Sequence, residues 1–481
     1  MSAPLEKLLR DARIDLVLAR IEKDSTIIKE VIEHLDSDIR SIKFNSINVL
    51  GELGEKSVVA VPKLISCLKD EDWSIRRETA RTLGKIGEMA EKAIPIISDL
   101  LDEKEETIRK EAAIALGKIR NPTSESLKAL VNTLKDESEI VRTEAAIALG
   151  EFGPEAFEAI PDLMNSIKDV SWTVRTASAL SISNIGKKAT KAIPTLINAL
   201  GDKDWRVRYR VVSTLSQIGE ESIPSLLNVV DHKNPKVRCG AIEALGEIRK
   251  ADPIIIEKLG LMLNDKKEKV RGKAADSLRL IGKESVPALI EALGKAKRKM
   301  KKIIISAIGG IGPEAKAAIP ILGEIIGSVA IQEIKLKREK SYSKSIYKAV
   351  FPVVSFISSL SETFSGPIKV EITRALGNIG KDSEEAVLIL ESALFNPKAT
   401  VRREAALALG KLGASSSTVI PSLIYALNDL NPDVRWRASE TLGIIGVRNE
   451  EITSKLNSLI HDKCDYVCES AINALDSLSE E

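Results

Sequence analysis

Residues 141–153 read Val-Arg-Thr-Glu-Ala-Ala-Ile-Ala-Leu-Gly-Glu-Phe-Gly, and this stretch is the unit from which the chain is built. Similar segments occupy 75–87, 174–186, 401–413 and 434–446. With Gly150 taken as a marker, equivalent positions fall at 51, 84, 117, 183, 216, 246, 279, 309, 377, 410, 443 and 476. Successive markers are 33 residues apart nine times, 30 twice and 68 once. A fixed period of this size is typical of a solenoid.

Each period contains two apolar stripes with helical spacing. Apolar residues follow the i, i+3, i+4, i+7 rule over 141–152 and again over 160–167. A polar turn such as 168–171 separates the two helices of a repeat, and Gly153 is suited to end the second helix in a left-handed conformation. A hairpin this small cannot bury both apolar faces alone, so it must stack on its neighbours. We therefore predict an all-α fold, an α-solenoid (superhelix) of about 14 helical hairpins.

Glycine and proline recur at fixed places within the repeat. A glycine inside a helix costs about 1 kcal/mol relative to alanine. Its recurrence as the marker predicts that the backbone of the neighbouring helix comes close at this point. A proline 11 residues after the marker is tolerated in the first turn of the first helix but would bend that helix further in. These prolines are Pro62, Pro95, Pro161, Pro194, Pro320 and Pro421.

Composition narrows the class of protein. Aromatic residues make up only 3% of the 481 residues, so the core must consist of Ala, Ile, Leu and Val, which suits closely packed helices. The net charge of +2, with 29% charged residues, indicates a surface on which both signs are mixed. Four cysteines are too few for a secreted disulfide framework, and the N-terminus lacks the apolar core of a signal peptide. With no run long enough to span a membrane, a soluble, cytoplasmic protein is expected.

The units resemble HEAT repeats of the short kind found in phycobilin-lyase-like proteins, and the resemblance covers almost the whole chain. It implies a ladder of aspartate and arginine residues that links adjacent repeats, with the second helices lining the concave surface. The ladder positions carried over from this resemblance are six residues apart: Asp70 and Arg76, Asp136 and Arg142, Asp169 and Arg175, Asp202 and Arg208, Asp265 and Arg271, and Asp429 and Arg435.

The repeats divide the chain into four expected segments. Residues 1–24 are expected to form capping helices, 25–312 a regular array, 313–366 a degenerate basic repeat or an insertion, and 367–481 the C-terminal repeats and cap. In the third segment a missing repeat would have its marker at Ser341, within a sequence that lacks the small apolar face. The ladder also fails nearby, where Lys301 and Lys369 replace arginine.

Motifs for catalysis are weak. The resemblance extends to HEAT-like iron hydroxylases, which use His-Glu dipeptides as metal ligands, but His34, His232 and His461 are not followed by Glu. His461, Cys464 and Cys468 could lie on one side of a helix end, although zinc requires a fourth ligand. No phosphate-binding loop or nucleophile elbow is present. We therefore expect no enzyme and no cofactor. A lyase of the bilin type or an oxidoreductase remains a disfavoured alternative by resemblance alone.

Aromatic and arginine residues at the starts of second helices are the main candidates for partner binding. They can cover the turn and pack on the adjacent repeat, or they can serve as exposed anchors for an extended protein or peptide on the concave face. Both interpretations remain open on sequence grounds, and the second predicts a protein-binding scaffold or adaptor. The candidate residues are Trp73, Arg77, Arg81, Trp172, Trp205, Arg206, Tyr209, Arg210, Trp436 and Arg437.

A basic stretch over 295–348 is the second candidate surface. It contains 13 Lys/Arg and four Asp/Glu, a net charge of +9, so the rest of the chain carries 2 − 9 = −7. Such a run can be a solvated face or can contact an acidic protein segment. Nucleic acid or an anionic surface is the alternative partner, less expected because stacking residues are sparse. The basic residues singled out are Lys295, Lys297, Arg298, Lys299, Lys301, Lys302, Lys335, Lys337, Arg338 and Lys340.

Overall fold

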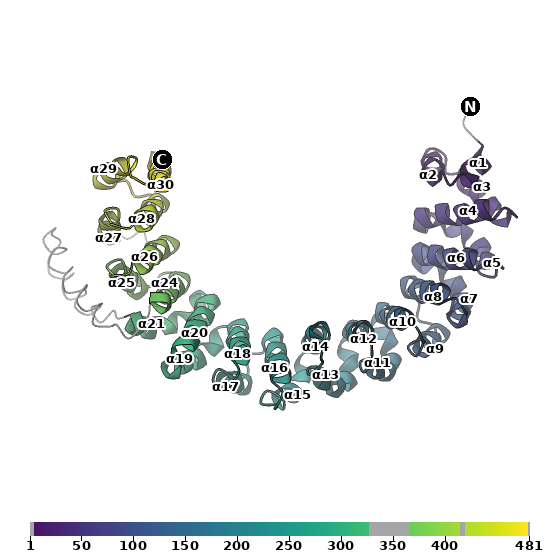
Figure 1. Ribbon diagram of the computed structural model, residues 1–481, viewed down its shortest axis with the longest axis horizontal. Coiled ribbons are helices and arrows are strands. Elements are labelled where there is room, and N and C mark those ends of the chain that lie inside the picture. The colour runs from purple at the N-terminus through teal and green to yellow at the C-terminus, as the bar shows by residue number, and fades with distance from the viewer. Residues whose placement is uncertain (1–3, 327–365, 414–418, 480–481) are drawn as a thin grey trace. The chain divides into compact units, whose positions relative to one another are not determined.

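The computed structural model describes residues 4–326, 366–413 and 419–479, and within these ranges every regular element is a helix. Figure 1 shows the helices stacked in pairs, so the predicted all-α solenoid is confirmed. The expected marker at Ser341 lies outside the described residues. No described helix is long and apolar enough to cross a membrane.

The helices fall into two rows. The N-terminus begins with α1 (Leu5–Arg10) and α2 (Ile14–Lys23). The first helices of the repeats are α3 (Ile27–Glu33), α5 (Val61–Cys67), α7 (Ile94–Asp99), α9 (Ser124–Thr133), α11 (Ile160–Ser166), α13 (Ile193–Ala199), α15 (Ile223–Leu227), α17 (Pro253–Met262), α19 (Val286–Lys295), α21 (Ile319–Ile326), α25 (Glu384–Ala393), α27 (Ile420–Ala426) and α29 (Glu450–Leu459). The second helices are α4 (Arg40–Leu53), α6 (Trp73–Ile86), α8 (Glu106–Ile119), α10 (Glu139–Glu151), α12 (Trp172–Ile185), α14 (Trp205–Ile218), α16 (Pro235–Ile248), α18 (Glu268–Ile281), α20 (Arg298–Ile311), α24 (Gly366–Ile379), α26 (Ala399–Lys411), α28 (Pro432–Ile445) and α30 (Asp465–Ser479).

Short 3-10 helices precede or extend many of the first helices. They are η1 (His34–Asp36), η2 (Gly54–Ala60), η3 (Gly87–Ala93), η4 (Leu100–Asp102), η5 (Gly153–Ala159), η6 (Gly186–Ala192), η7 (Gly219–Ser222), η8 (Lys283–Ser285) and η9 (Pro313–Ala318). The recurring prolines that follow these segments stand at the start of the α-helix, as in α5, α7 and α11. They therefore cost no internal hydrogen bond.

The chain divides into two compact units, residues 1–244 and 245–481, and the division falls within α16. In the first unit, α4, α6, α8, α10, α12 and α14 each pack against the next in one row, and the first helices form a second row behind them. The row of second helices lies on the inner side of the curve within this unit (Figure 1). In the second unit α24, α26, α28 and α30 pack in the same way.

The second unit contains a direct contact between α20 and α24. A Cβ added to Gly309 would lie 3.0 Å from the Cα of Ala375, and Asn378 Nδ2 donates to the carbonyl oxygen of Gly309 at 3.4 Å. This is the contact that consecutive second helices make elsewhere, and α21 packs against α24 as a first helix does. The expectation of a degenerate repeat or an insertion at 313–366 stays a prediction, because residues 327–365 lie outside the described ranges.

The marker glycine sets the distance between second helices. A Cβ added to Gly84 would lie 2.9 Å from the Cα of Ala115, and one added to Gly117 would lie 2.9 Å from the Cα of Ala148. Real Cβ atoms do not approach a backbone this closely, so the predicted packing reason for these glycines is confirmed. Several second helices are followed by a glycine with another role: Gly87, for example, ends α6 with φ of 74°.

Arginines join neighbouring repeats in a ladder. Arg175 Nη1 donates to the carbonyl oxygen of Asp169, six residues earlier, at 2.9 Å. Its Nε and Nη2 bind the carboxylate of Asp202, 27 residues later in the next repeat, at 2.8 and 3.0 Å. Arg175 therefore binds Asp169, six residues earlier, only through the backbone carbonyl of that residue. Its ion pair is with Asp202 and connects one repeat to the next. The inter-repeat link implied by the family resemblance is confirmed.

Candidate functional site: a groove and aromatic residues on the second helices

A groove crosses four consecutive second helices of the first unit. It has a volume of about 730 Å³ and lies along α4, α6, α8 and α10. Because the marker glycines have no side chain, they lower the floor of the groove where one helix meets the next. The lining residues are Gly51, Glu52, Gly54, Gly84, Lys85, Gly87, Ile114, Gly117, Lys118, Arg120, Glu144, Ile147, Ala148 and Glu151.

Charges of both signs line this groove and are paired across repeats. Lys85 Nζ binds Glu52 at 2.8 Å, and Arg120 Nη2 binds Glu151 at 2.7 Å. Burial raises the pKa of Glu144. The lining holds three carboxylates and three cationic side chains, so the groove carries no net charge. A neutral lining with apolar Ile114 and Ile147 suits a polypeptide better than a polyphosphate.

Trp205 and Tyr209 are the most exposed large aromatic residues that the structure describes, at 65% and 62%. They stand four residues apart on α14 and therefore share one face of that helix. Arg210 is different, because it is half-buried and its Nε has no hydrogen-bond partner among the described residues. Of the three, only the two aromatic side chains form an accessible surface.

Trp172 is partly covered by the next repeat. Arg206 lies with its Cζ 3.4 Å from the centroid of the Trp172 ring, and it also pairs with Asp204 at 2.7 Å. That hydrogen bond from Arg206 lowers the pKa of Asp204 to about 2. Trp172 and Arg206, both candidates for partner binding, thus contact each other across a repeat boundary, and Trp172 is 37% exposed.

Trp73 begins α6 and is 44% exposed. Arg77 lies with its Cζ 5.3 Å from the ring centroid. Arg81, one turn further along, is 3.8 Å from a carboxylate oxygen of Glu78 and 3.9 Å from one of Glu111. Trp73, Arg77 and Arg81 follow one another at intervals of four residues, so they lie along one face of α6.

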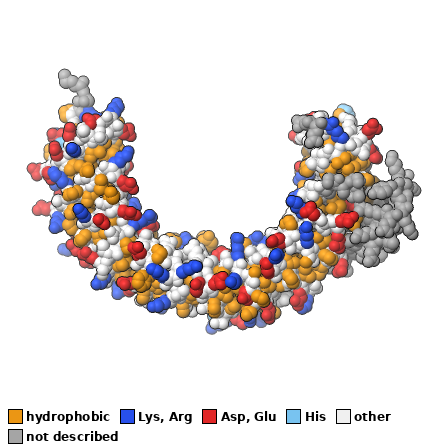
Figure 2. Space-filling view, turned by 180° about the vertical axis from the view of Figure 1, so that it is seen from behind, with side chains coloured by type: hydrophobic (Ala, Val, Ile, Leu, Met, Phe, Trp, Pro, Cys, Tyr) orange, Lys and Arg blue, Asp and Glu red, His pale blue; other side chains and the backbone are white. Residues whose placement is uncertain are grey.

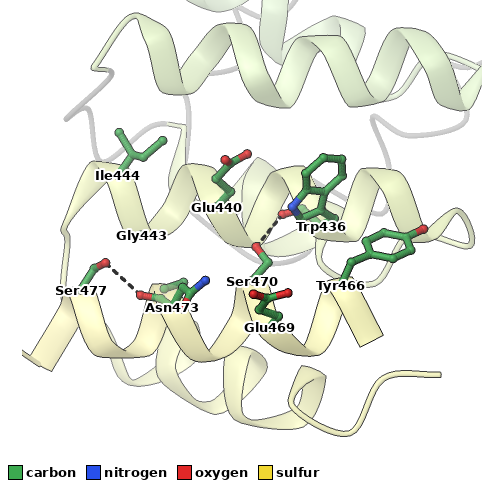
Figure 3. Close-up of a pocket in the computed structure, with 10 residues that line it drawn as sticks. Trp436, Glu440, Gly443, Ile444, Tyr466, Glu469, Ser470, Asn473 and Ser477 are labelled. Atoms are coloured by element: carbon green, nitrogen blue, oxygen red, sulfur yellow. Dashed lines mark hydrogen bonds between the residues drawn. The ribbon is translucent and has the colours of Figure 1, made fainter. Parts of the chain in front are cut away.

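Trp436 belongs to a separate pocket in the second unit, between α28 and α30 (Figure 3). Its ring is half-buried, with Arg437 Cζ 3.8 Å from the centroid and Tyr466 edge-on at 5.8 Å between centroids. Arg437 in turn pairs with Glu440 at 2.5 Å. The pocket has a volume of about 440 Å³, and Glu440, Ile444, Glu469 and Asn473 are among its lining residues.

The described part of the basic stretch lies at the end of α19 and the start of α20. Lys295, Lys297, Lys299 and Lys302 are exposed, as is Arg298, while Lys301 is half-buried. Lys335, Lys337, Arg338 and Lys340 lie outside the described residues. On the face shown in Figure 2, Lys and Arg side chains are interspersed with Asp and Glu.

No group of three or more His, Cys, Asp or Glu residues is placed to hold a metal ion within the described ranges. Cys464 and Cys468 form no disulfide, and Cys468 Sγ donates to the carbonyl oxygen of Asp462 at 3.1 Å. The local backbone therefore explains the position of Cys468.

Sequence reasoning missed the groove itself. It singled out Trp, Tyr and Arg residues, whereas the groove is floored by marker glycines and by Ile114 and Ile147. The available signal was the position three residues before the marker. It holds isoleucine in these two repeats, on a helix face that is otherwise polar.

Comparison with known proteins gives the family. The family model for HEAT repeats matches residues 28–117, 61–132, 99–183 and 193–259, and the model for the PBS lyase HEAT-like repeat matches 270–295 and 401–429. None of the curated proteins is significantly similar to the chain in sequence.

Among solved structures, importin beta in an ammonium sulfate condition is 12% identical, with 97% of this chain and 69% of that chain covered and a TM-score of 0.50. The Kap95:Nup1 complex gives 12% identity, 97% and 74% coverage and a TM-score of 0.47. An engineered protein gives 18% identity, 94% and 98% coverage and a TM-score of 0.33. At such identities the likeness concerns the fold alone. The two repeat models together match more than half of the chain, and with the ladder and the paired helices they lead to one conclusion: the chain is a HEAT-repeat protein, in which residues 270–295 and 401–429 match the PBS lyase HEAT-like repeat.

Proposed function

We propose that the protein is a non-enzymatic scaffold that binds an extended segment of a partner protein in the groove on the second helices of its first unit. The observation that carries this proposal is the continuity of the groove over four repeats, α4 to α10. Packed helices are about 9 Å apart, and an extended chain rises about 3.3 Å per residue. Three such steps therefore accommodate roughly eight residues of an extended peptide.

The chemistry of the lining favours a peptide. Glycines allow the backbone of a ligand to come close, Ile114 and Ile147 offer apolar contact, and the paired charges can hydrogen-bond to peptide groups. Trp205 and Tyr209 lie further along the same row of second helices, where they can add aromatic contacts to a longer partner. The proposed location is the cytoplasm, because four cysteines are too few for a secreted disulfide framework.

A displayed library of random peptides of about 12 residues tests the proposal. We expect peptides to be enriched on the wild-type protein and their affinity to fall about tenfold or more in the I114K/I147K variant, because a lysine in the groove removes apolar contact. The matched control is I254K/L261K, which adds the same two charges at side chains that are 57% and 55% exposed on α17, a first helix of the second unit. Equal affinity for the groove variant and the control would refute the groove as the site.

A second measurement guards against a folding defect in the double variant. A photo-crosslinking amino acid at position 147 should capture the enriched peptide, and the same amino acid at position 261 should not. Circular dichroism of each variant reports whether the helices are intact. Failure to enrich any peptide would count against a peptide-binding function.

A further inference from the structure

The arginine ladder has a regular geometry where it is complete. In these rungs, both Nε and Nη2 of an arginine hold the two carboxylate oxygens of an aspartate in the next repeat, at 2.6–3.0 Å. Pairs with this geometry include Arg109 and Asp136, Arg142 and Asp169, Arg175 and Asp202, Arg402 and Asp429, and Arg435 and Asp462. The position is thus built to receive a carboxylate.

Arg271 forms only the first half of such a rung. Its Nη1 donates to the carbonyl oxygen of Asp265 at 2.8 Å, as the other ladder arginines do within their own repeats. In the next repeat, the ladder position six residues before Lys301 holds Lys295 instead of aspartate. Lys295 pairs with Glu291 on its own helix at 2.7 Å. Among the described residues, no carboxylate forms an ion pair with Arg271.

Further positive charge surrounds this incomplete rung. Lys266 and Lys267 before α18 and Lys269 in its first turn are exposed, and so are Lys297 before α20 and Lys299 in its first turn. Residues 265–302 contain 13 Lys/Arg and five Asp/Glu, a net charge of 13 − 5 = +8. Neither α18 nor α20 has a side-chain hydrogen bond at its N-cap, so the positive ends of the two helix dipoles add to this field.

We propose that an acidic segment of a protein partner docks on this edge of the second unit and that one of its carboxylates completes the rung at Arg271. The same arginine position binds a carboxylate with two hydrogen bonds in the complete rungs, which is the chemical reason for choosing an acidic peptide. Residues 261–302 contain no aromatic side chain on which bases could stack. The inference is independent of the groove, because it uses residues of the other unit.

The test restores the missing aspartate. In the K295D variant, an internal carboxylate would occupy the rung and compete with the partner. We expect a fluorescent peptide of alternating Glu and Ser to bind K295D about tenfold or more weakly than wild type, since a charge-assisted pair is lost. The midpoint of urea unfolding should rise in the same variant. The control K283D makes the same charge change at an exposed lysine between α18 and α19, and should weaken binding less than about threefold by field effects alone.

A double-mutant cycle makes the result specific. R271M should also weaken peptide binding, and adding R271M to K295D should produce little further loss, because both changes act on the same rung. Equal weakening by K295D and K283D would overturn the proposal in favour of diffuse attraction. Tighter binding of a 20-base-pair DNA duplex than of the peptide, at the same salt concentration, would overturn it in favour of a nucleic-acid surface.

Discussion

Arg142 and Asp169 lie in adjacent repeats, and two hydrogen bonds of 2.8 and 3.0 Å join the guanidinium of one to the carboxylate of the other. Their side chains are only 12% and 13% exposed. A pair so well covered holds two repeats at a fixed register, and its loss leaves a charge with little access to water.

The first prediction compares a covered pair with an exposed one. R175A removes the partner of Asp202, whose side chain is 12% exposed, and should lower the free energy of unfolding by about 3 kcal/mol. R120A breaks the pair with Glu151, in which the side chains are 58% and 39% exposed, and should cost less than about 1 kcal/mol. Urea unfolding of both variants measures the difference. Equal losses would mean that the ladder stabilises no more than a surface ion pair.

The second prediction concerns acid. Hydrogen bonds from Ser74 and Arg40 lower the pKa of Asp72 to about 2 from its ordinary value of 3.8, and the hydrogen bond from Arg435 lowers that of Asp462. Because the folded-state pKa lies below the unfolded one, the stabilisation is complete above pH 3.8 and is lost as the pH falls toward 2. Urea midpoints measured at pH 6, 4, 3 and 2.5 should fall steeply below pH 4. A D72N variant should show a smaller dependence, and an unchanged one would contradict the assignment.

The third prediction concerns two glycines in helices. G84A places a Cβ 2.9 Å from the Cα of Ala115 and should destabilise the protein by about 1–3 kcal/mol through overpacking. G272A, inside α18, has no atom within 4 Å of the added Cβ and should stabilise by about 0.5–1 kcal/mol through helix propensity. Thermal unfolding of both variants gives the comparison. A change of the same sign in both would show that close packing does not explain the marker.

The fourth prediction concerns the exposed aromatic pair. The W205A/Y209A variant should keep the helical circular-dichroism signal and change stability by less than about 1 kcal/mol, because both side chains are more than 60% exposed. Binding of a selected peptide long enough to reach α14 should nevertheless weaken. Wild-type affinity in this variant would contradict a contact between the peptide and Trp205 or Tyr209.

The architecture could be read from the sequence because one local pattern repeats. The spacing of the marker fixes the helix pairs. The prolines and the helix-ending glycines follow from local backbone chemistry, and the marker glycines follow from the close approach of the next second helix. The packing of individual side chains could not be read in this way. Trp172 and Trp205 have the same register, yet Arg206 covers the ring of Trp172, whereas no described residue covers the ring of Trp205 in this way. Likewise, the sequence identified Lys295 only as part of a basic stretch. The structure shows that the equivalent position in complete rungs holds an aspartate that binds the arginine of the preceding repeat.

The contact between Gly84 and Ala115 has a consequence for the history of the chain. Since each repeat meets only its neighbours, through a glycine on one side and a small residue on the other, a tandem duplication of 33 codons would insert a new hairpin with compatible partners on both sides. The length of the groove along the second helices is then a property that gene duplication can extend or shorten stepwise, without a new fold.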